Sequence, residues 1–259
     1  MTHTERALAV LRYQEYDRLP IVHFGFWRDT LEKWCAEGHL SKEEQEGQRD
    51  GNFYDKSIAD KLGFDFNWQN MSQANTRLNP GFDPKVIKVL PDGSRHVLNG
   101  DGVVTVANAE ASGIPAHVDH LLKGRGSWEE HYKWRYKFST DRMARKSFEE
   151  LKTSQGKAPL GLHCGSLFGH IRSVLGIEGV SYLYVDDEPL YREIIDTVGE
   201  LCFTTVSYIL QSGLQFDFAH FWEDICFKNG PLVSPAVFRE YVGPHYKRIT
   251  NLVNQHGID

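Results

Sequence analysis

Short apolar runs alternate along the chain with stretches of helical periodicity. Four of the runs are bounded by turn residues and are expected to be buried core strands, at 21–24, 64–68, 159–165 and 216–222. Helical stretches separate them, and the clearest begins at Pro189 and ends before Gly213. Such an alternation predicts an α/β fold with parallel strands.

A different pattern occupies residues 76–125. Three short alternating runs, at 86–90, 95–98 and 103–106, are separated by Pro91-Asp92-Gly93 and Gly100-Asp101-Gly102, which are typical hairpin turns. We therefore predict a β-meander insertion at about 76–125, lying over one end of the core. Residues 1–259 are otherwise treated as a single domain.

The number of core strands limits the architecture. A closed (β/α)₈ barrel uses eight strands in about 250 residues, whereas this chain has four expected core strands in 259 residues. Two interpretations remain, an open four-stranded α/β sheet and a partial barrel, and we favour the partial barrel. Its fourth strand would then leave an apolar edge unpaired, which predicts marginal solubility or self-association into a homodimer.

Composition narrows the function classes. The chain is 41% apolar and 25% charged, as in globular proteins, and its net charge of −6 argues against a nucleic-acid or polybasic membrane role. It has no apolar run of about 18 residues and no signal-peptide pattern at its start. The four cysteines are far apart and form no CxxC pair. We expect a cytoplasmic protein with reduced thiols and no membrane or nucleic-acid partner.

Residues 221–249 carry a family resemblance. Phe221-Trp222-Glu223-Asp224 is followed by Gly230-Pro231-Leu232-Val233-Ser234-Pro235 and then by Pro244-His245-Tyr246-Lys247. This block resembles the uroporphyrinogen decarboxylase superfamily, in which an acid-terminated strand precedes "G-x-L-S-P-x-x-F" and "P-Y-x-K-x-I". Weaker similarities are Asp17-Arg18-Leu19-Pro20, Gly165-Ser166-Leu167-Phe168 and Glu188-Pro189. The resemblance implies a TIM (β/α)₈ barrel.

The superfamily contains two characterised chemistries. One branch decarboxylates uroporphyrinogen, a step of porphyrin biosynthesis, without a cofactor, and binds substrate carboxylates with an "R-Q-A-G-R" segment. Here that segment is Gly25-Phe26-Trp27-Arg28-Asp29, and the branch's "E-S" is Glu223-Asp224, which adds negative charge. The other branch moves methyl groups between a corrinoid protein and a thiol, using zinc. The departures make strict decarboxylation a runner-up to corrinoid-linked methyl transfer.

Other readings remain open beside these two. A non-catalytic barrel that senses a small molecule is a third possibility. The resemblance implies zinc and a corrinoid protein partner only for the methyltransferase branch, whose zinc ligands would lie beyond Asp259. The metal therefore stays unknown at this stage.

Chemistry in parallel barrels lies at the carboxyl ends of the strands. We predict that His163, His220, Glu223 and Asp224 are catalytic. Expected small-molecule substrate contacts are His23, Trp27, Arg28, Asp65, Asn67 and Ser166. We also expect Glu223 and Asp224 to share a mouth with His23 and His163.

Each choice has a structural alternative. The histidines could be hydrogen-bonded core residues, the acids could cap a turn, and Arg28 could pair with Asp29 or Glu32. Cys164 fits a buried thiol better than an activated one.

Overall fold

A computed structural model describes residues 1–72, 74–107, 115–143, 151–152, 156 and 158–258. The first half contains α1 (His3–Leu11), β1 (Val22–His23), α2 (Arg28–Ala36), α3 (Lys42–Gly47), α4 (Phe53–Leu62), β2 (Phe66–Asn67), β3 (Lys85–Val89), β4 (Arg95–Leu98), β5 (Val103–Ala107) and β6 (His117–His120). The second half contains α5 (Arg125–Ser127), η1 (Trp128–Tyr132), η2 (Lys133–Tyr136), η3 (Thr140–Arg142), β7 (Gly161–His163), α7 (Phe168–Asp186), α8 (Glu188–Leu210), β8 (Phe218–His220), β9 (Cys226–Phe227), β10 (Gly230–Pro231), α9 (Pro235–Val237), η4 (Phe238–Val242) and α10 (Gly243–Gln255).

All four expected core strands are present and parallel, although each is shorter than its apolar run. β1 pairs with β2, and β7 pairs with β8. A parallel bridge between Met71 and Gly161 joins the two pairs, so the spatial order is β1, β2, β7, β8. The described residues form an open arc of parallel strands in a mixed helix and sheet fold, and they do not form a closed barrel.

The two faces of the arc differ in what they contact. Leu162 is fully buried against the helices of the main core. Its neighbours Gly161 and His163 point to the opposite side, because successive strand residues alternate. On that side Phe218 lies edge-on to Trp68, with ring centroids 4.9 Å apart. We call this side, marked by Trp68, His163, Phe218 and His220, the inner face.

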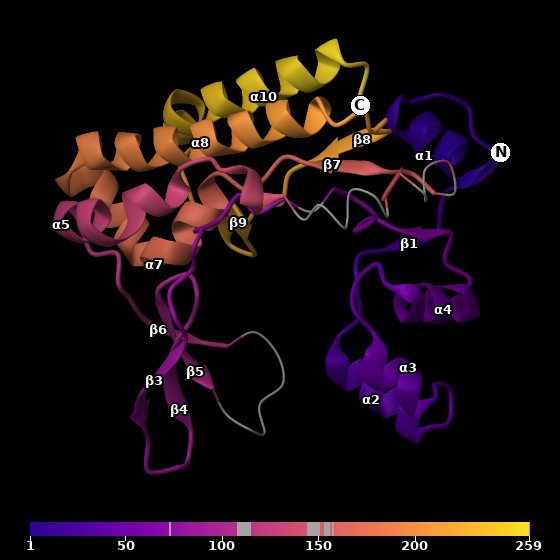
Figure 1. Cartoon of the computed structure of the whole chain (residues 1–259), viewed down its shortest axis with the longest axis horizontal. Coiled ribbons are helices and arrows are strands. Elements are labelled where there is room, and N and C mark those ends of the chain that lie inside the picture. Colours follow the sequence, from indigo (N-terminus) through magenta and orange to yellow (C-terminus); the bar gives the residue numbers. More distant parts are fainter. Residues whose placement is uncertain (73, 108–114, 144–150, 153–155, 157, 259) are drawn as a thin grey trace.

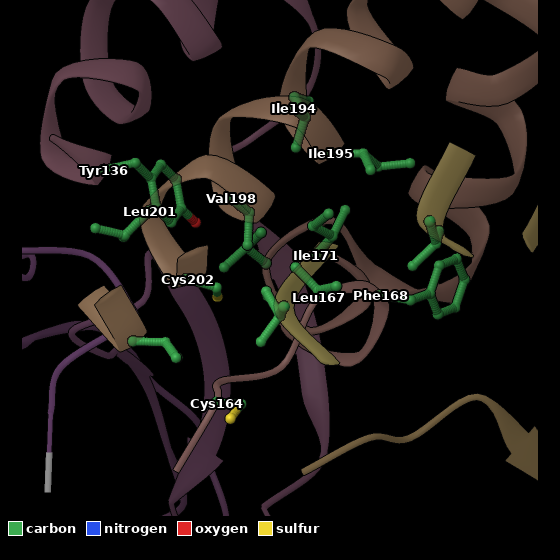
Figure 2. Packing of buried hydrophobic residues seen from close by; sticks show 14 of the residues in the cluster. Tyr136, Cys164, Leu167, Phe168, Ile171, Ile194, Ile195, Val198, Leu201 and Cys202 are labelled. Carbon is green, nitrogen blue, oxygen red and sulfur yellow. The ribbon is translucent and has the colours of Figure 1, made fainter. Parts of the chain in front are cut away.

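The main core lies between α7, α8 and the outer side of β7 and β8 (Figure 2). Asp187 caps α8 by accepting the Leu190 amide, and Pro189 stands in its first turn, as the sequence predicts. One apolar side of this helix is buried over its whole length, including Ile194, Val198 and Leu201. This is the amphipathic pattern from which the helix is predicted.

Residues 85–120 form an antiparallel sheet in the order β3-β4-β5-β6. Three of its strands match the expected runs, and β6 was not predicted. The sheet extends away from α7, whereas α2, α3 and α4 extend from the other end of the strand arc (Figure 1). After the sheet the chain forms a π-helical turn, η1, followed by a 3₁₀ turn, η2.

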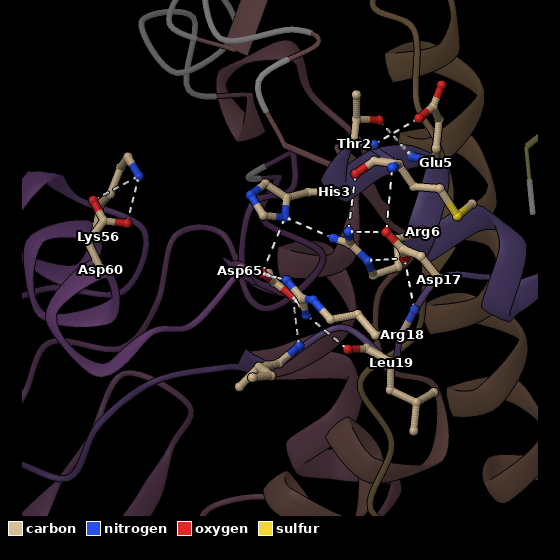
Figure 3. A network of polar contacts seen from close by, with 12 residues as sticks. Thr2, His3, Glu5, Arg6, Asp17, Arg18, Leu19, Lys56, Asp60 and Asp65 are labelled. Carbon is tan, nitrogen blue, oxygen red and sulfur yellow. Dashed lines mark hydrogen bonds and ion pairs between the residues drawn. The ribbon is translucent and has the colours of Figure 1, made fainter.

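Ion pairs and hydrogen bonds connect the amino-terminal segment to the start of β2. Arg18 forms a two-pronged ion pair with Asp65, with both N–O distances 2.6 Å, and Asp65 also accepts the amide of Ile21 (Figure 3). Arg6 of α1 binds Asp17 in the same network. No helix among the described residues has the length and apolar character needed to cross a bilayer.

Candidate functional site

His163 and His220 face each other at the carboxyl ends of β7 and β8. They are partners in the parallel register, and their ring centroids are 6.0 Å apart. The ring of Trp222 lies 6.2 Å beyond His220. The sequence placed these histidines on separate strands, and the structure brings them together on the inner face.

Burial controls the charge of this pair. Burial, followed by the neighbouring His220 and Arg77, lowers the pKa of His163 to about 4. Burial also lowers the pKa of His220. Both rings are therefore neutral at pH 7, and each can accept or donate a hydrogen bond.

A cavity of about 240 Å³ opens beside His163. Its walls come from the segment after β2, the end of β7, the start of α7 and the segment after β8. The lining residues are Ala74, Asn75, Thr76, Arg77, His163, Ser166, His170 and Trp222. A partly enclosed cavity with several polar residues, at the carboxyl ends of parallel strands, is the position expected for a substrate site.

Ser166 and His170 belong to the turn that follows β7. The Ser166 hydroxyl accepts the His170 amide at 3.0 Å, in the first turn of α7. The His170 ring is buried, and its Nε2 lies 2.8 Å from the hydroxyl of Tyr136. Burial lowers the pKa of His170 to about 3, so this ring is neutral as well.

Glu223 holds elements together around the cavity. Its carboxylate accepts the amides of Leu167 at 2.5 Å and Gly169 at 2.8 Å, and it also accepts the hydroxyl of Tyr246 from α10. A Cβ at position 169 would lie 2.9 Å from the backbone nitrogen of Asp224 and 3.0 Å from Glu223 Oε2, which explains the glycine. The carboxylate thus satisfies backbone donors at the start of α7.

Asp224 has a separate partner. It forms an ion pair with Arg172, one turn into α7. Both carboxylates are thus engaged by α7, and neither acid lines the cavity beside His163.

His23 and Asn67 lie on the other face of the arc. The His23 ring packs between Phe26 and Phe64, at 4.6 and 4.7 Å, whereas the adjacent Phe24 contacts Trp222. Because strand side chains alternate, the expectation that His23 shares the mouth with His163 is wrong. Asn67, its register partner, donates to Asp55 at 2.7 Å.

Three further expected substrate contacts lie away from the cavity. Asp65 precedes β2 and is paired with Arg18 at the amino end of the strands. Trp27 and Arg28 begin α2, where Trp27 is 64% exposed and Arg28 pairs with Glu32 at 3.0 Å. Arg28 therefore pairs with Glu32, which is the structural alternative to substrate binding that the sequence left open.

The described residues do not fit a catalytic zinc site, which normally has three protein ligands. No group of three or more histidine, cysteine, aspartate or glutamate side chains in the described ranges is arranged to hold a metal. Cys164 is buried toward the helices, where burial raises the pKa of its thiol to about 12. It is an unreactive core thiol in this environment.

Sequence reasoning missed Arg77, Tyr136 and His170. Arg77 follows β2 in a segment interpreted as the start of the insertion, and Tyr136 comes from a segment distant in sequence. His170 could have been found, because it falls in the first turn after the third strand, where a barrel helix faces the site.

No protein-family model matches the sequence, and no curated protein matches it. Among solved structures, the chain is similar to a methyltransferase from Methanosarcina mazei, with a TM-score of 0.52 and 15% sequence identity. The superposition covers 98% of this chain and 68% of that chain. At this identity the likeness concerns the fold alone.

Proposed function

We propose that this chain is a methyl-transfer enzyme of the uroporphyrinogen-decarboxylase-like superfamily, with its substrate in the cavity beside His163. The carrying observation is the fold similarity to a methyltransferase over 98% of the chain. The cavity at the carboxyl ends of β7 and β8 supports it, because that is where this kind of fold places its chemistry.

The neutral histidines suit a thiol acceptor. A thiol must lose its proton to become a good nucleophile, and a neutral imidazole can accept that proton. In the proposed reaction the thiol sulfur forms a bond to the methyl carbon as the bond from that carbon to the corrinoid cobalt breaks. The corrinoid would supply the methyl group and retain the electron pair of the broken bond, and His220 would accept the thiol proton and pass it to water.

The test is a methyl-transfer assay on the purified chain. Methylcobalamin would be mixed with a neutral thiol, 2-mercaptoethanol, or an anionic one, 3-mercaptopropionate, with and without added zinc. We expect protein-dependent loss of the methylcobalamin spectrum and formation of the thioether. His220→Gln should lower kcat by about 10²-fold or more, whereas His131→Gln on the exposed η1 turn should leave it unchanged.

Two other outcomes would redirect the proposal. Conversion of uroporphyrinogen to coproporphyrinogen, with no methyl transfer, would favour the decarboxylase branch. Saturable binding of corrinoid or thiol without turnover, weakened by His220→Ala, would favour a ligand sensor.

A further inference from the structure

Strand β3 has an unusually exposed surface for a sheet strand. It is the outer strand of the antiparallel sheet, and all five of its residues are exposed. Its apolar side chains, Val86, Ile87 and Val89, are 50%, 50% and 64% exposed. Lys85 and Lys88 form no ion pair with any residue that the structure describes. The strand therefore presents apolar surface together with two unpaired positive charges.

The edge of β3 is poorly suited to pairing with another strand. The pairing of β3 with β4 shifts register between Val86 and Lys88. Bulges and lysines on an edge strand both disfavour edge-to-edge pairing. Two copies joined through this edge would also gather the lysines of both strands together, where like charges repel. A partner is therefore expected to contact the side chains of β3 rather than to extend the sheet.

A groove of about 750 Å³ lies at the opposite edge of the sheet, between β6 and α7. It shares no lining residue with the cavity beside His163. Three of its lining side chains are apolar and exposed, Val118 of β6 and Ile177 and Tyr182 of α7. Exposed apolar side chains gathered in a hollow of this size are typical of an interaction site.

The charges of the groove are unbalanced. Its cations Arg172 and Lys123 are each paired with an acid of the same chain, and its Asp187 is paired with an arginine. Glu178 and Asp186 also line the groove, and neither forms an ion pair within the described part of the chain. Two unpaired negative charges beside apolar side chains complement the two lysines and the apolar side chains of β3.

The β3 strand of one copy cannot fill the groove of the same copy. β3 and β6 are the two edges of the sheet, with β4 and β5 between them. Three strand spacings of about 4.8 Å place the two edges about 14 Å apart. The sheet also extends away from α7 (Figure 1), which leaves β3 free to contact another molecule.

We propose that this chain self-associates head to tail, with β3 of one copy bound in the groove between β6 and α7 of the next. Lys85 and Lys88 pair with Glu178 and Asp186, and the apolar side chains of β3 cover those of the groove. Because the two surfaces differ, the contact is heterologous and generates a ring or an open chain of copies. This interface is separate from the unpaired edge of β8, and it does not depend on methyl transfer.

Sedimentation velocity of the whole chain tests the contact across about a hundredfold range of micromolar concentrations. We expect the average mass to rise with concentration, and to rise less at high salt, which screens the ion pairs. Lys88→Glu and Glu178→Lys should each weaken association by more than about tenfold, because each places like charges in the contact. Lys247→Glu on α10 and Glu15→Lys make the same charge changes at exposed positions elsewhere, and should associate like the parent.

Mixing the two single variants gives a readout that misfolding cannot imitate. In the mixture every contact between unlike copies again joins opposite charges, either the original pair or the exchanged pair. Association should therefore return when Lys88→Glu and Glu178→Lys are combined, although neither associates alone. A double variant carrying both substitutions in one chain should associate by itself.

Recovery in the mixture and in the double variant sustains the proposal. A species with the mass of one copy at every concentration overturns it. Association that persists in both single variants overturns it as well, and would indicate another surface such as the β8 edge. Equal weakening in the control variants, or loss in the single variants without recovery in the mixture, would also reject the paired surfaces.

Discussion

Residues of the same type have different roles here because their burial and partners differ. His163 and His170 line one cavity and His220 lies beside His163, whereas His23 is packed between two phenylalanines on the other face. The burial that prepares the cavity also keeps its imidazoles neutral. Low pH should therefore reduce the stability of the folded state, because a histidine in the unfolded chain is free to take up a proton.

Acidification should therefore destabilise the protein through His170. The unfolded side chain binds a proton near pH 6.5, but the folded one does so only near pH 3. As the pH falls below about 6.5 the unfolded state gains protons, so stability is lost until about pH 3. Urea unfolding between pH 7 and 4.5 should show a slope shallower by about 1.4 kcal/mol per pH unit in His170→Gln. An unchanged slope would contradict the buried neutral state; exposed His131→Gln is the control.

Asp65 should affect the pH dependence of stability in a lower pH range than His170. The Arg18 hydrogen bonds lower its pKa to about 2, so its contribution is present at pH 7 and is lost as the pH falls from about 4 to about 2. We expect Asp65→Asn to cost about 1–2 kcal/mol at pH 7, because solvent around Arg18 screens the pair.

Urea unfolding at pH 7 and pH 2.5 measures this cost, and the difference from the parent should shrink at the lower pH. Asp60→Asn removes an exposed helical pair with Lys56 (Figure 3) and should change stability by less than about 0.5 kcal/mol. Equal effects of the two substitutions would contradict a structural role for Asp65.

At the scale of elements, the start of α7 is the junction of the site. It follows β7, carries Ser166 and His170, and is held by Glu223 from the segment after β8. Tyr246 of α10 joins the same carboxylate, and burial raises its pKa, so its hydroxyl stays a donor. One side chain thus connects three segments of the chain.

Glu223→Ala should destabilise the fold by about 1–3 kcal/mol, since buried amides lose their acceptor. Asp224→Ala, which removes only the partly exposed partner of Arg172, should cost less than about 1 kcal/mol. Thermal or urea unfolding measures both. If Glu223→Ala kept full stability but lost methyl transfer, Glu223 would be catalytic, as the sequence predicts, rather than positioning.

At the scale of the whole molecule, apolar burial is unequal. The main cluster draws on residues from Leu78 to Ile258, whereas α2–α4 share a small separate cluster of Leu31, Leu40 and Ile58. Segments with little buried apolar surface open at lower free energy than the global core.

Hydrogen exchange should reveal this difference. Backbone amides in α8 should exchange only through global unfolding, and those in α2–α4 should exchange faster through local opening. Mass spectrometry of proteolytic fragments after timed exchange measures both regions in one sample. Equal protection of α2–α4 and α8 would show that the clusters open together.

The sequence by itself determined the four parallel strands, three strands of the antiparallel sheet and the long helix α8. These elements follow from apolar periodicity, turn residues and caps, which are local properties. It also placed His163 and His220 at the carboxyl ends of strands, where the structure has them. Tertiary structure decided the rest, including strand pairing through the Met71–Gly161 bridge, the face on which His23 lies and the partners of Glu223. Arg77, Tyr136 and His170 come from three separated segments, and only packing of the chain brings Arg77 and His170 to one cavity and Tyr136 against His170.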